Sequence, residues 1–267
     1  MGEIDISERP GGVRVVRLNR PDRLNAPTPD MVRLITEAME AGQDHRAIVI
    51  TGSGRGFCAG VDIAGAHERQ RGRSNADAFA LQERFGGMVL AIARAPVPVI
   101  SAVNGPAAGA GMAIALASDV RIASESARFI IGAPNIGLSA GECGISYFLP
   151  RIVGLGRAAE IMLTNRHVHA EEALSIGLVT ELAAPDDLEA AAGRLADAMG
   201  ALSPFGQKMT KQVYRANADA SSLEEALQLE NRTQILANAT ADAAEARAAF
   251  LEKRRPGFTG RRPATRP

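Results

Sequence analysis

The chain has 267 residues, of which 46% are hydrophobic, and its 30 basic and 30 acidic residues give a formal net charge of zero. A chain of this length and composition can bury one substantial core, as a soluble enzyme does. A net charge of zero gives no general attraction to a polyanion, so no nucleic-acid partner is expected.

The N-terminal residues 1–12 include acidic side chains and no apolar signal core, and no later run approaches about 18 uninterrupted apolar residues. Two cysteines, Cys58 and Cys143, lack CxxC spacing and stand among apolar or glycine residues, which is typical of free thiols in a reducing compartment. We therefore expect a cytoplasmic protein, neither secreted nor membrane-spanning.

Strand and helix patterns alternate over residues 1–200. The predicted strands are 13–18, 47–50, 97–103 and 120–123, and the predicted helices include 28–41 and 76–93. This alternation is typical of an α/β fold.

The composition changes after residue 186, where the chain becomes rich in Ala, Glu and Leu. Helices are predicted at 186–199, 204–218, 221–237 and 240–252. Ser203 and Ser222 precede proline or acidic residues, as N-caps do. The arginine- and proline-rich residues 254–267 are expected to form a solvated tail, although their charges could also meet a phosphate.

Two glycine-rich loops each follow a predicted strand. The first, within residues 51–64, has neither a P-loop Lys-Ser/Thr pair nor a GxGxxG that opens a helix. The second spans residues 104–111 and leads into an apolar, helix-like run to Ala117. If the loops face each other, one N–H from each could hold a carbonyl oxygen at about 2.7 to 3.1 Å. The alternative is two ordinary turns.

Short motifs in the same order and spacing connect the chain to one known family. They are Leu18-Asn19-Arg20-Pro21 with Leu24-Asn25-Ala26, Phe57-Cys58-Ala59-Gly60-Val61-Asp62, Asn104-Gly105 with the 109–111 glycine loop, 149–154, Leu163-Thr164 with 170–173 and 177–179, and 250–256 with Phe258. By these residues, the chain resembles the crotonase, or enoyl-CoA hydratase/isomerase, family from about residue 4 to residue 260.

The resemblance implies an α/β fold with a spiral of ββα turns over residues 1–200 that holds a CoA-thioester site. It implies that the helices over residues 201–267 pack against neighbours in homotrimers, which commonly pair into hexamers. From the sequence alone, the apolar faces of these helices need burial either within the chain or against another subunit. The expected substrate is an acyl-CoA, with coenzyme A as part of the substrate and no prosthetic group.

By the same resemblance, the oxyanion donors are the backbone N–H groups of Val61 and Ala110. The residues expected to contact CoA are Arg23, Leu24, Ala26, Ala59, Asp62 and Ile63, with Phe250 and Lys253 reaching in from a neighbouring chain. Plain core packing is the alternative for Leu24, Ile63 and Phe250. Asp62 could instead brace its own loop, and Lys253 could belong to a solvated run of charges.

The family's hydratases use two glutamates, and both positions are alanine here, at Ala113 and Ala133. One acid stands nearby: Glu142, expected at the start of a helix running to Leu149, where other family members, such as dienoyl-CoA isomerases, place a catalytic aspartate. A single carboxylate beside an oxyanion hole can move a proton between two carbons or activate a water. The alternative is a glutamate that only favours the helix dipole.

Other residues are weaker candidates for catalysis or metal binding. The four histidines do not form a metal set, since His167 and His169 lack a third ligand at a known offset. Cys143 has no histidine close in sequence and reads as a small buried thiol rather than a nucleophile. Ser146 and Tyr147 could orient Glu142, and His67 could belong to a lid or to an ordinary surface loop.

Three functions stay open. The first is a hydratase/isomerase-type enzyme of acyl-CoA metabolism, a lyase or an isomerase, with Glu142 as its single acid/base. The second is acyl-CoA hydrolysis or carbon–carbon cleavage in the same pocket. The third is an acyl-CoA-binding protein without catalysis, which Ala113 and Ala133 favour and Glu142 disfavours.

Overall fold

The structure is a computed structural model that describes residues 2–60 and 74–260. The chain divides into two compact units, Met1–Ala196 and Asp197–Pro267. None of the helices in the described part of the chain is long and apolar enough to cross a membrane.

The first unit contains a six-stranded sheet in the order β1-β2-β3-β4-β6-β9. Its strands are β1 (Ile4–Arg9), β2 (Val13–Leu18), β3 (Ala47–Gly52), β4 (Val99–Val103), β6 (Val120–Ser124) and β9 (Glu181–Ala183). Only β1 and β2 pair antiparallel, and the other neighbours are parallel. Every residue of β3 and β4 is buried, which explains why these strands read as continuous apolar runs.

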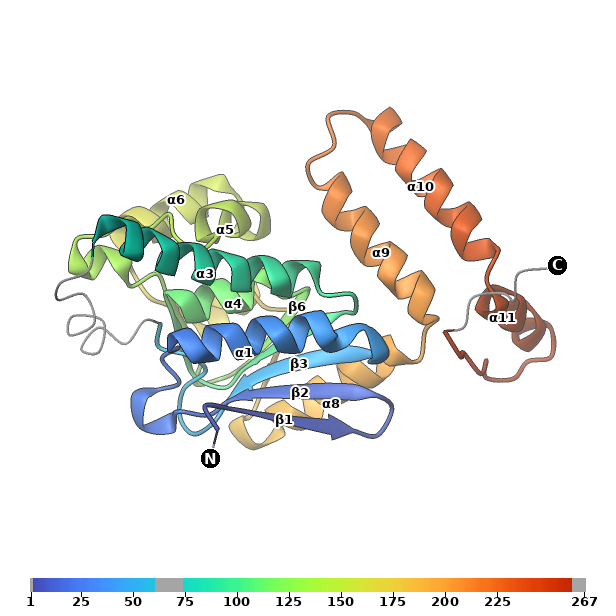
Figure 1. Ribbon diagram of the computed structural model, residues 1–267, viewed down its shortest axis with the longest axis horizontal. Coiled ribbons are helices and arrows are strands. Elements are labelled where there is room, and N and C mark those ends of the chain that lie inside the picture. The colour runs from blue at the N-terminus through green and yellow to red at the C-terminus, as the bar shows by residue number, and fades with distance from the viewer. Residues whose placement is uncertain (1, 61–73, 261–267) are drawn as a thin grey trace. The chain divides into compact units, whose positions relative to one another are not determined.

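Helices cover this sheet (Figure 1). The helix α1 (Pro29–Glu40) buries Met31, Ile35 and Met39 and packs against α3 (Asn75–Arg94). Thr28 caps α1 by accepting the Met31 N–H at 3.1 Å. The bounds of these elements confirm the strands and helices expected in this region to within a few residues.

A second, three-stranded sheet has the order β5-β7-β8. It is formed by β5 (Pro106–Ala108), β7 (Arg128–Ile130) and β8 (Val168–His169). The helix α4 (Ala110–Ala117) follows β5 directly and is buried along its whole length. This sheet therefore places the second glycine loop in the middle of the core.

The remaining helices of this region are α5 (Ile145–Val153), α6 (Leu155–Thr164), α7 (Ala170–Ser175) and α8 (Leu188–Gly200). Short 3₁₀ turns cover Pro21–Arg23, Ala41–Asp44, Ala133–Ile136 and Pro185–Asp187. The expected helix end at Leu149 is wrong, because α5 continues through Pro150 to Val153. A proline removes one N–H donor and usually kinks a helix, but it does not always end one.

The second unit is helical, with α9 (Pro204–Asn217), α10 (Leu223–Asn238) and α11 (Ala241–Leu251). The predicted caps are confirmed, since Ser203 and Ser222 accept the N–H groups of Gly206 and Glu225. None of the residues of α10 is buried. Large apolar side chains consequently remain exposed on these helices, among them Leu223, Ile235 and Phe250.

Residues 254–260 fold back on α11 rather than forming a free tail. The Glu245 carboxylate accepts hydrogen bonds from Arg254 and from the Gly257 N–H at 2.8 Å. The buried Asp242 accepts the N–H groups of Thr259 and Gly260 at 2.9 and 3.1 Å. The expectation of a solvated surface segment is confirmed for these residues, which are nearly all exposed, but the segment is bound to α11 by hydrogen bonds.

Candidate functional site

The two glycine loops lie side by side in the first unit. Cys58 bridges to Ala107 in parallel, and the Ala108 N–H donates to the Cys58 carbonyl at 2.8 Å. A Cβ at Gly111 would lie 2.1 Å from the same carbonyl, and one at Gly60 would lie 2.8 Å from the Ala108 carbonyl. Glycine is required at both positions because the backbones approach so closely. The hypothesis of two facing loops is confirmed for the residues that the structure describes.

Ala110 is the first residue of α4, and its N–H has no partner within the helix. No described residue accepts a hydrogen bond from it. Gly109 precedes it with φ 49° and ψ −117°, a conformation that favours glycine. The Ala110 N–H is thus an available donor at the positive end of a helix dipole. Val61, expected to supply the second donor, lies outside the described residues.

Two asparagines brace the first glycine loop. The buried Asn25 donates to the Ser53 and Gly56 carbonyls at 2.9 and 2.8 Å and accepts the Arg20 N–H at 2.9 Å. Asn104 accepts the Gly52 N–H at 3.1 Å and donates to the Gly54 carbonyl at 2.9 Å. Both asparagines belong to the family motifs, but nothing in the sequence alone indicated that their amides hold this loop.

Glu142 lies near the second loop. A Cβ placed on Gly109 would lie 3.5 Å from the Glu142 Oε1, and the same position is 3.7 Å from the Cα of Gly60 in the first loop. The side chain is half-buried, and burial raises the pKa of its carboxyl above the ordinary glutamate value. This carboxylate is therefore close to the position where a thioester held by the second loop would react.

A tight turn sets the position of Glu142. Cys143 and Gly144 both have positive φ, 45° and 78°, and the Ile145 N–H donates to the Glu142 carbonyl at 2.8 Å. Because α5 begins only at Ile145, the expectation that Glu142 starts this helix is wrong. The helix-dipole explanation of Glu142 weakens accordingly, since that effect falls off beyond the first turn.

At the two positions where the resemblance placed the hydratase glutamates, the side chains have no proton to transfer. Ala113 is fully buried inside α4, and Ala133 is 7% exposed at the start of a 3₁₀ turn. Burial raises the pKa of the Cys143 thiol to about 11 and that of Cys58 to about 12. Both thiols are therefore protonated at neutral pH and poor nucleophiles.

The tyrosine proposed to orient Glu142 has another neighbour. The Arg151 guanidinium lies 3.7 Å from the centroid of the Tyr147 ring. Orientation of Glu142 by Ser146 or Tyr147 stays a prediction. Among the described residues, no three His, Cys, Asp or Glu side chains gather closely enough to hold a metal ion.

Four of the residues expected to contact CoA lie beside the first loop. The Ala59 N–H donates to the Leu24 carbonyl at 2.9 Å. Arg23 is exposed, Leu24 is half-buried and Ala26 is buried. Asp62 and Ile63 lie outside the described residues, as does His67.

The other two, Phe250 and Lys253, belong to the second unit. Phe250 is 83% exposed, so it does not pack in the core of the second unit. Lys253 is also exposed and has φ 54°.

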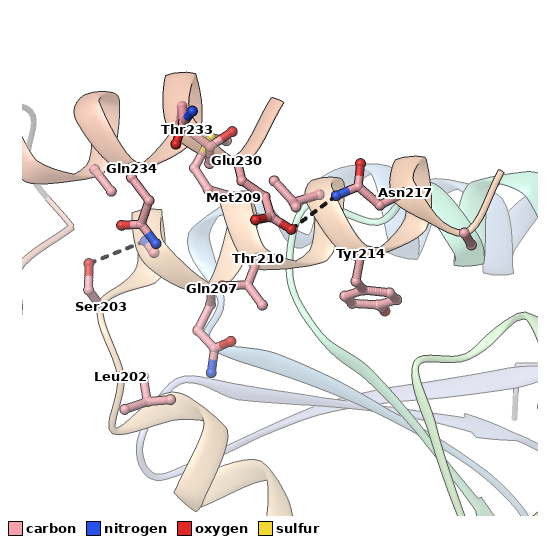
Figure 2. A pocket seen from close by; sticks show the side chains of 15 residues that line it. Leu202, Ser203, Gln207, Met209, Thr210, Tyr214, Asn217, Glu230, Thr233 and Gln234 are labelled. Atoms are coloured by element: carbon pink, nitrogen blue, oxygen red, sulfur yellow. Dashed lines mark hydrogen bonds between the residues drawn. The ribbon is translucent and has the colours of Figure 1, made fainter. Parts of the chain in front are cut away.

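A separate hollow of about 840 Å³ lies between α9 and α10 (Figure 2). Its walls come from the second unit, and Asn217 donates to Glu230 across it at 3.3 Å. None of the residues expected to act on the thioester lines this hollow. It is therefore not a candidate for the reaction.

Comparisons with known proteins agree on one family. The family described as Enoyl-CoA hydratase/isomerase matches residues 8–261. A probable enoyl-CoA hydratase of Mycobacterium leprae is 40% identical, over 91% of this chain and 85% of the relative. The 1,2-epoxyphenylacetyl-CoA isomerase of Escherichia coli is 35% identical, over 98% of this chain and all of the relative. The solved structure of a putative enoyl-CoA hydratase from Streptomyces coelicolor has a TM-score of 0.92 and 36% identity, covering 97% and 95% of the two chains.

Proposed function

The chain belongs to the enoyl-CoA hydratase/isomerase family, and on this premise we propose that the glycine loops hold the thioester oxygen of an enoyl-CoA while Glu142 alone moves the proton. The protein is an enzyme of the hydratase/isomerase type. The observation that carries the catalytic assignment is the position of the Glu142 carboxylate, whose Oε1 lies 3.5 Å from where a Cβ on Gly109 would be, one residue before Ala110.

The first step is polarisation of the thioester. When a proton leaves the carbon chain or a nucleophile adds to it, negative charge develops on the thioester oxygen. The Ala110 N–H, assisted by the dipole of α4, would donate to that oxygen, with the Val61 N–H as the second donor. Backbone donors of this kind cost no reorganisation during the reaction, because the loops are already held in place.

The second step is proton transfer by one carboxylate. In a double-bond isomerisation, Glu142 would take a proton from one carbon and return it to another. In a hydration, it would take a proton from water as the hydroxyl adds to the β-carbon and then deliver that proton to the α-carbon. Ala113 and Ala133 leave this role to Glu142 in either case.

Isomerisation is the second candidate beside hydration. The absence of carboxylates at positions 113 and 133 favours it. Isomerisation needs one group that moves a proton between two carbons, and it needs no water held by a pair of glutamates. The relative from Escherichia coli is named as an isomerase, while others are named as probable hydratases.

Binding of CoA would use the residues beside the first loop. We assign Arg23, Leu24, Ala26 and Ala59 to the nucleotide and pantetheine, with Asp62 and Ile63 beyond them. Phe250 and Lys253 would reach a neighbouring copy of the chain in a homotrimer or a dimer of trimers. Coenzyme A enters with the substrate, the chemistry needs no prosthetic group, and the free thiols fit a cytoplasmic enzyme.

The experiment uses crotonyl-CoA, a 3-enoyl-CoA and a saturated acyl-CoA in ¹⁸O-water and in D₂O. Solvent oxygen in an enoyl-derived product indicates hydration, whereas deuterium without oxygen indicates isomerisation. Solvent oxygen in a released acid indicates hydrolysis.

Glu142→Gln should lower kcat by about 10²- to 10⁴-fold while leaving acyl-CoA binding in place. Glu83→Gln, an exposed glutamate on α3, is the matched control. Unchanged turnover in Glu142→Gln would remove Glu142 from the mechanism.

A further inference from the structure

Asn165 ends the helix α6 and contacts a segment far away in the sequence. Its backbone is left-handed, with φ 53° and ψ 26°. Its side-chain Oδ1 accepts the N–H of Gly132 at 3.0 Å. Asparagine and glycine are the residues that most readily adopt this backbone, and of the two only asparagine carries a hydrogen-bond acceptor.

The contact with Gly132 lies next to the second glycine loop. The Gly109 N–H donates to the carbonyls of Ile130 and Ile131, at 3.0 and 3.1 Å. A Cβ at Gly132 would lie 3.8 Å from the Gly109 nitrogen. The hydrogen bond that Asn165 accepts thus fixes Gly132, directly after Ile130 and Ile131. The carbonyls of these two residues hold Gly109, and Gly109 precedes Ala110.

The sheet does not supply this support. The strand β7 ends at Ile130, and its partner β8 has only two residues, paired as Arg128 with His169 and Phe129 with Val168. Beyond Ile130 no ladder continues, so the Gly132 N–H needs an acceptor from elsewhere. The Asn165 amide is that acceptor.

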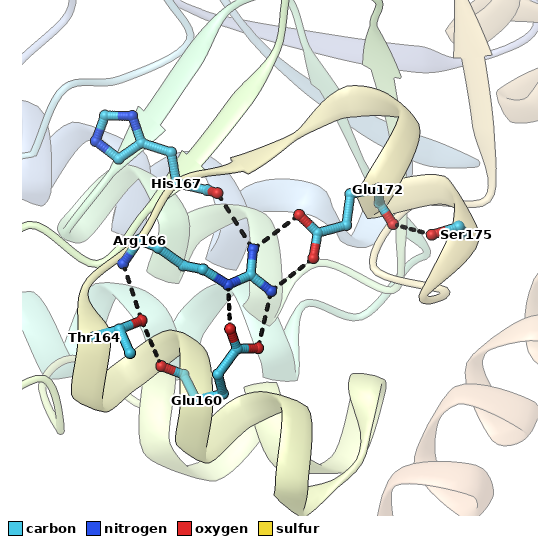
Figure 3. Close-up of polar contacts among 6 residues, drawn as sticks. All are labelled: Glu160, Thr164, Arg166, His167, Glu172 and Ser175. Carbon is cyan, nitrogen blue, oxygen red and sulfur yellow. Dashed lines mark hydrogen bonds and ion pairs between the residues drawn. The ribbon is translucent and has the colours of Figure 1, made fainter.

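The neighbouring residue, Arg166, is bound to two helices (Figure 3). Its guanidinium donates to Glu160 of α6 at 2.7 and 3.0 Å and to Glu172 of α7 at 2.7 and 2.8 Å. These hydrogen bonds lower the pKa of both glutamates. Paired contacts of this kind add geometric specificity, so the peptide that carries Asn165 is fixed from both sides.

We propose that Asn165 is a positioning residue for the reaction: its side-chain carbonyl fixes Gly132, and through the Ile130 and Ile131 carbonyls it aims the Gly109–Ala110 peptide at the thioester oxygen. This inference rests on the function proposed above. Asn165 itself does not touch the substrate.

The test compares Asn165→Gly, Asn165→Asp and Thr164→Val. Asn165→Gly keeps the left-handed backbone and removes the side-chain amide with its acceptor, while Asn165→Asp has an acceptor oxygen at the same position. Thr164 ends the same helix, is exposed, donates to the Glu160 carbonyl and accepts the Arg166 N–H at 3.4 Å. Thr164→Val removes both hydrogen bonds but leaves the Asn165 side chain intact, so it is a control for local destabilisation. Melting temperatures of the wild type and the three variants are measured in parallel.

We expect Asn165→Gly to lower kcat by about tenfold, because small misplacements of an oxyanion donor are costly, with KM changed less than about twofold. Asn165→Asp should regain most of this loss, and Thr164→Val should keep the wild-type kcat. A wild-type kcat in Asn165→Gly would overturn the proposal. So would an Asn165→Asp variant as slow as Asn165→Gly, or an equal loss in Thr164→Val.

Amide NMR separates this inference from the proposed function. In Asn165→Gly, the Gly132, Gly109 and Ala110 amide signals should all shift, and the change in the Ala110 signal on adding butyryl-CoA should shrink. If the wild type turns over no ester, the proposed function fails, but these shifts still report the contact. Unchanged Gly109 and Ala110 signals in Asn165→Gly would overturn the positioning role whatever the turnover.

Discussion

At the scale of single residues, the proposed chemistry depends on where one carboxylate lies. Glu142 precedes the turn at Cys143 and Gly144, and its Oε1 lies 3.5 Å from the position that a Cβ on Gly109 would occupy. Left-handed backbone in a non-glycine residue such as Cys143 costs free energy and persists only where the surroundings require it. The fold therefore bears a local strain at the residue next to its proposed acid/base.

The raised pKa of Glu142 has a measurable consequence for rate. Burial disfavours the charged carboxylate and so raises its pKa. Glu142 can accept a proton only when ionised, so kcat should rise with pH through a value above the ordinary glutamate pKa of about 4.3 and then level off. A profile of kcat against pH at saturating enoyl-CoA measures this rise. The Glu142→Gln variant should not show the rise, and a rise that persists in the variant would assign the titration to another group.

At the scale of elements, the site depends on two backbone segments that touch without side chains between them. The helix α4 begins so close to the first loop that Gly111 has no room for a methyl group. The asparagines Asn25 and Asn104 then hydrogen-bond the Gly52 N–H and the Ser53, Gly54 and Gly56 carbonyls of that loop. Close approach and these hydrogen bonds together hold the two loops next to each other over the described residues.

Two glycine-to-alanine substitutions test this packing. Gly111→Ala should destabilise the protein by about 1–3 kcal/mol, because the new Cβ overlaps the Cys58 carbonyl. Gly86, in the exposed middle of α3, has no atom within 4 Å of the Cβ position. Gly86→Ala should therefore stabilise it by about 0.5–1 kcal/mol through helix propensity. Urea denaturation of both variants measures the difference, and equal stability of the two would contradict the close approach.

At the scale of the whole molecule, the helices of the second unit carry several exposed large apolar side chains. Leu223, Ile235 and Phe250 are 74%, 71% and 83% exposed, and α10 has no buried residue. Exposed apolar patches of this kind commonly mark protein interfaces. They support the proposal that the helical unit contacts further copies of the chain.

A substitution on α10 tests this assembly. Sedimentation of the wild type is expected to give the mass of a trimer or a hexamer. Ile235→Glu should shift the protein to smaller species, because a charge would be buried in the contact. Gln228→Glu adds the same charge at another exposed position of α10 and should leave the mass unchanged. A monomeric wild type, or an Ile235→Glu variant of unchanged mass, would contradict the proposed assembly.

Local signals explain what could be predicted. The helices between residues 186 and 252 were expected to within a few residues because apolar spacing and capping serines act within one turn. The two corrections near the site arose because α5 passes through Pro150, and because two residues with positive φ delay its start beyond Glu142. Neither the tolerance of a proline nor a left-handed cysteine is visible in a pattern of residue types.

The sequence by itself determined the family, the α/β class, the two glycine loops and the alanines at positions 113 and 133, because these depend on residue identity and spacing. Only the tertiary structure decided that the loops touch at Cys58 and Ala107, that Glu142 lies against Gly109, and that Asn165 supports Gly132. The physical reason is distance along the chain. Each of these contacts joins segments separated by more than thirty residues, and such pairs are brought together by the packing of the whole core, which no local pattern encodes.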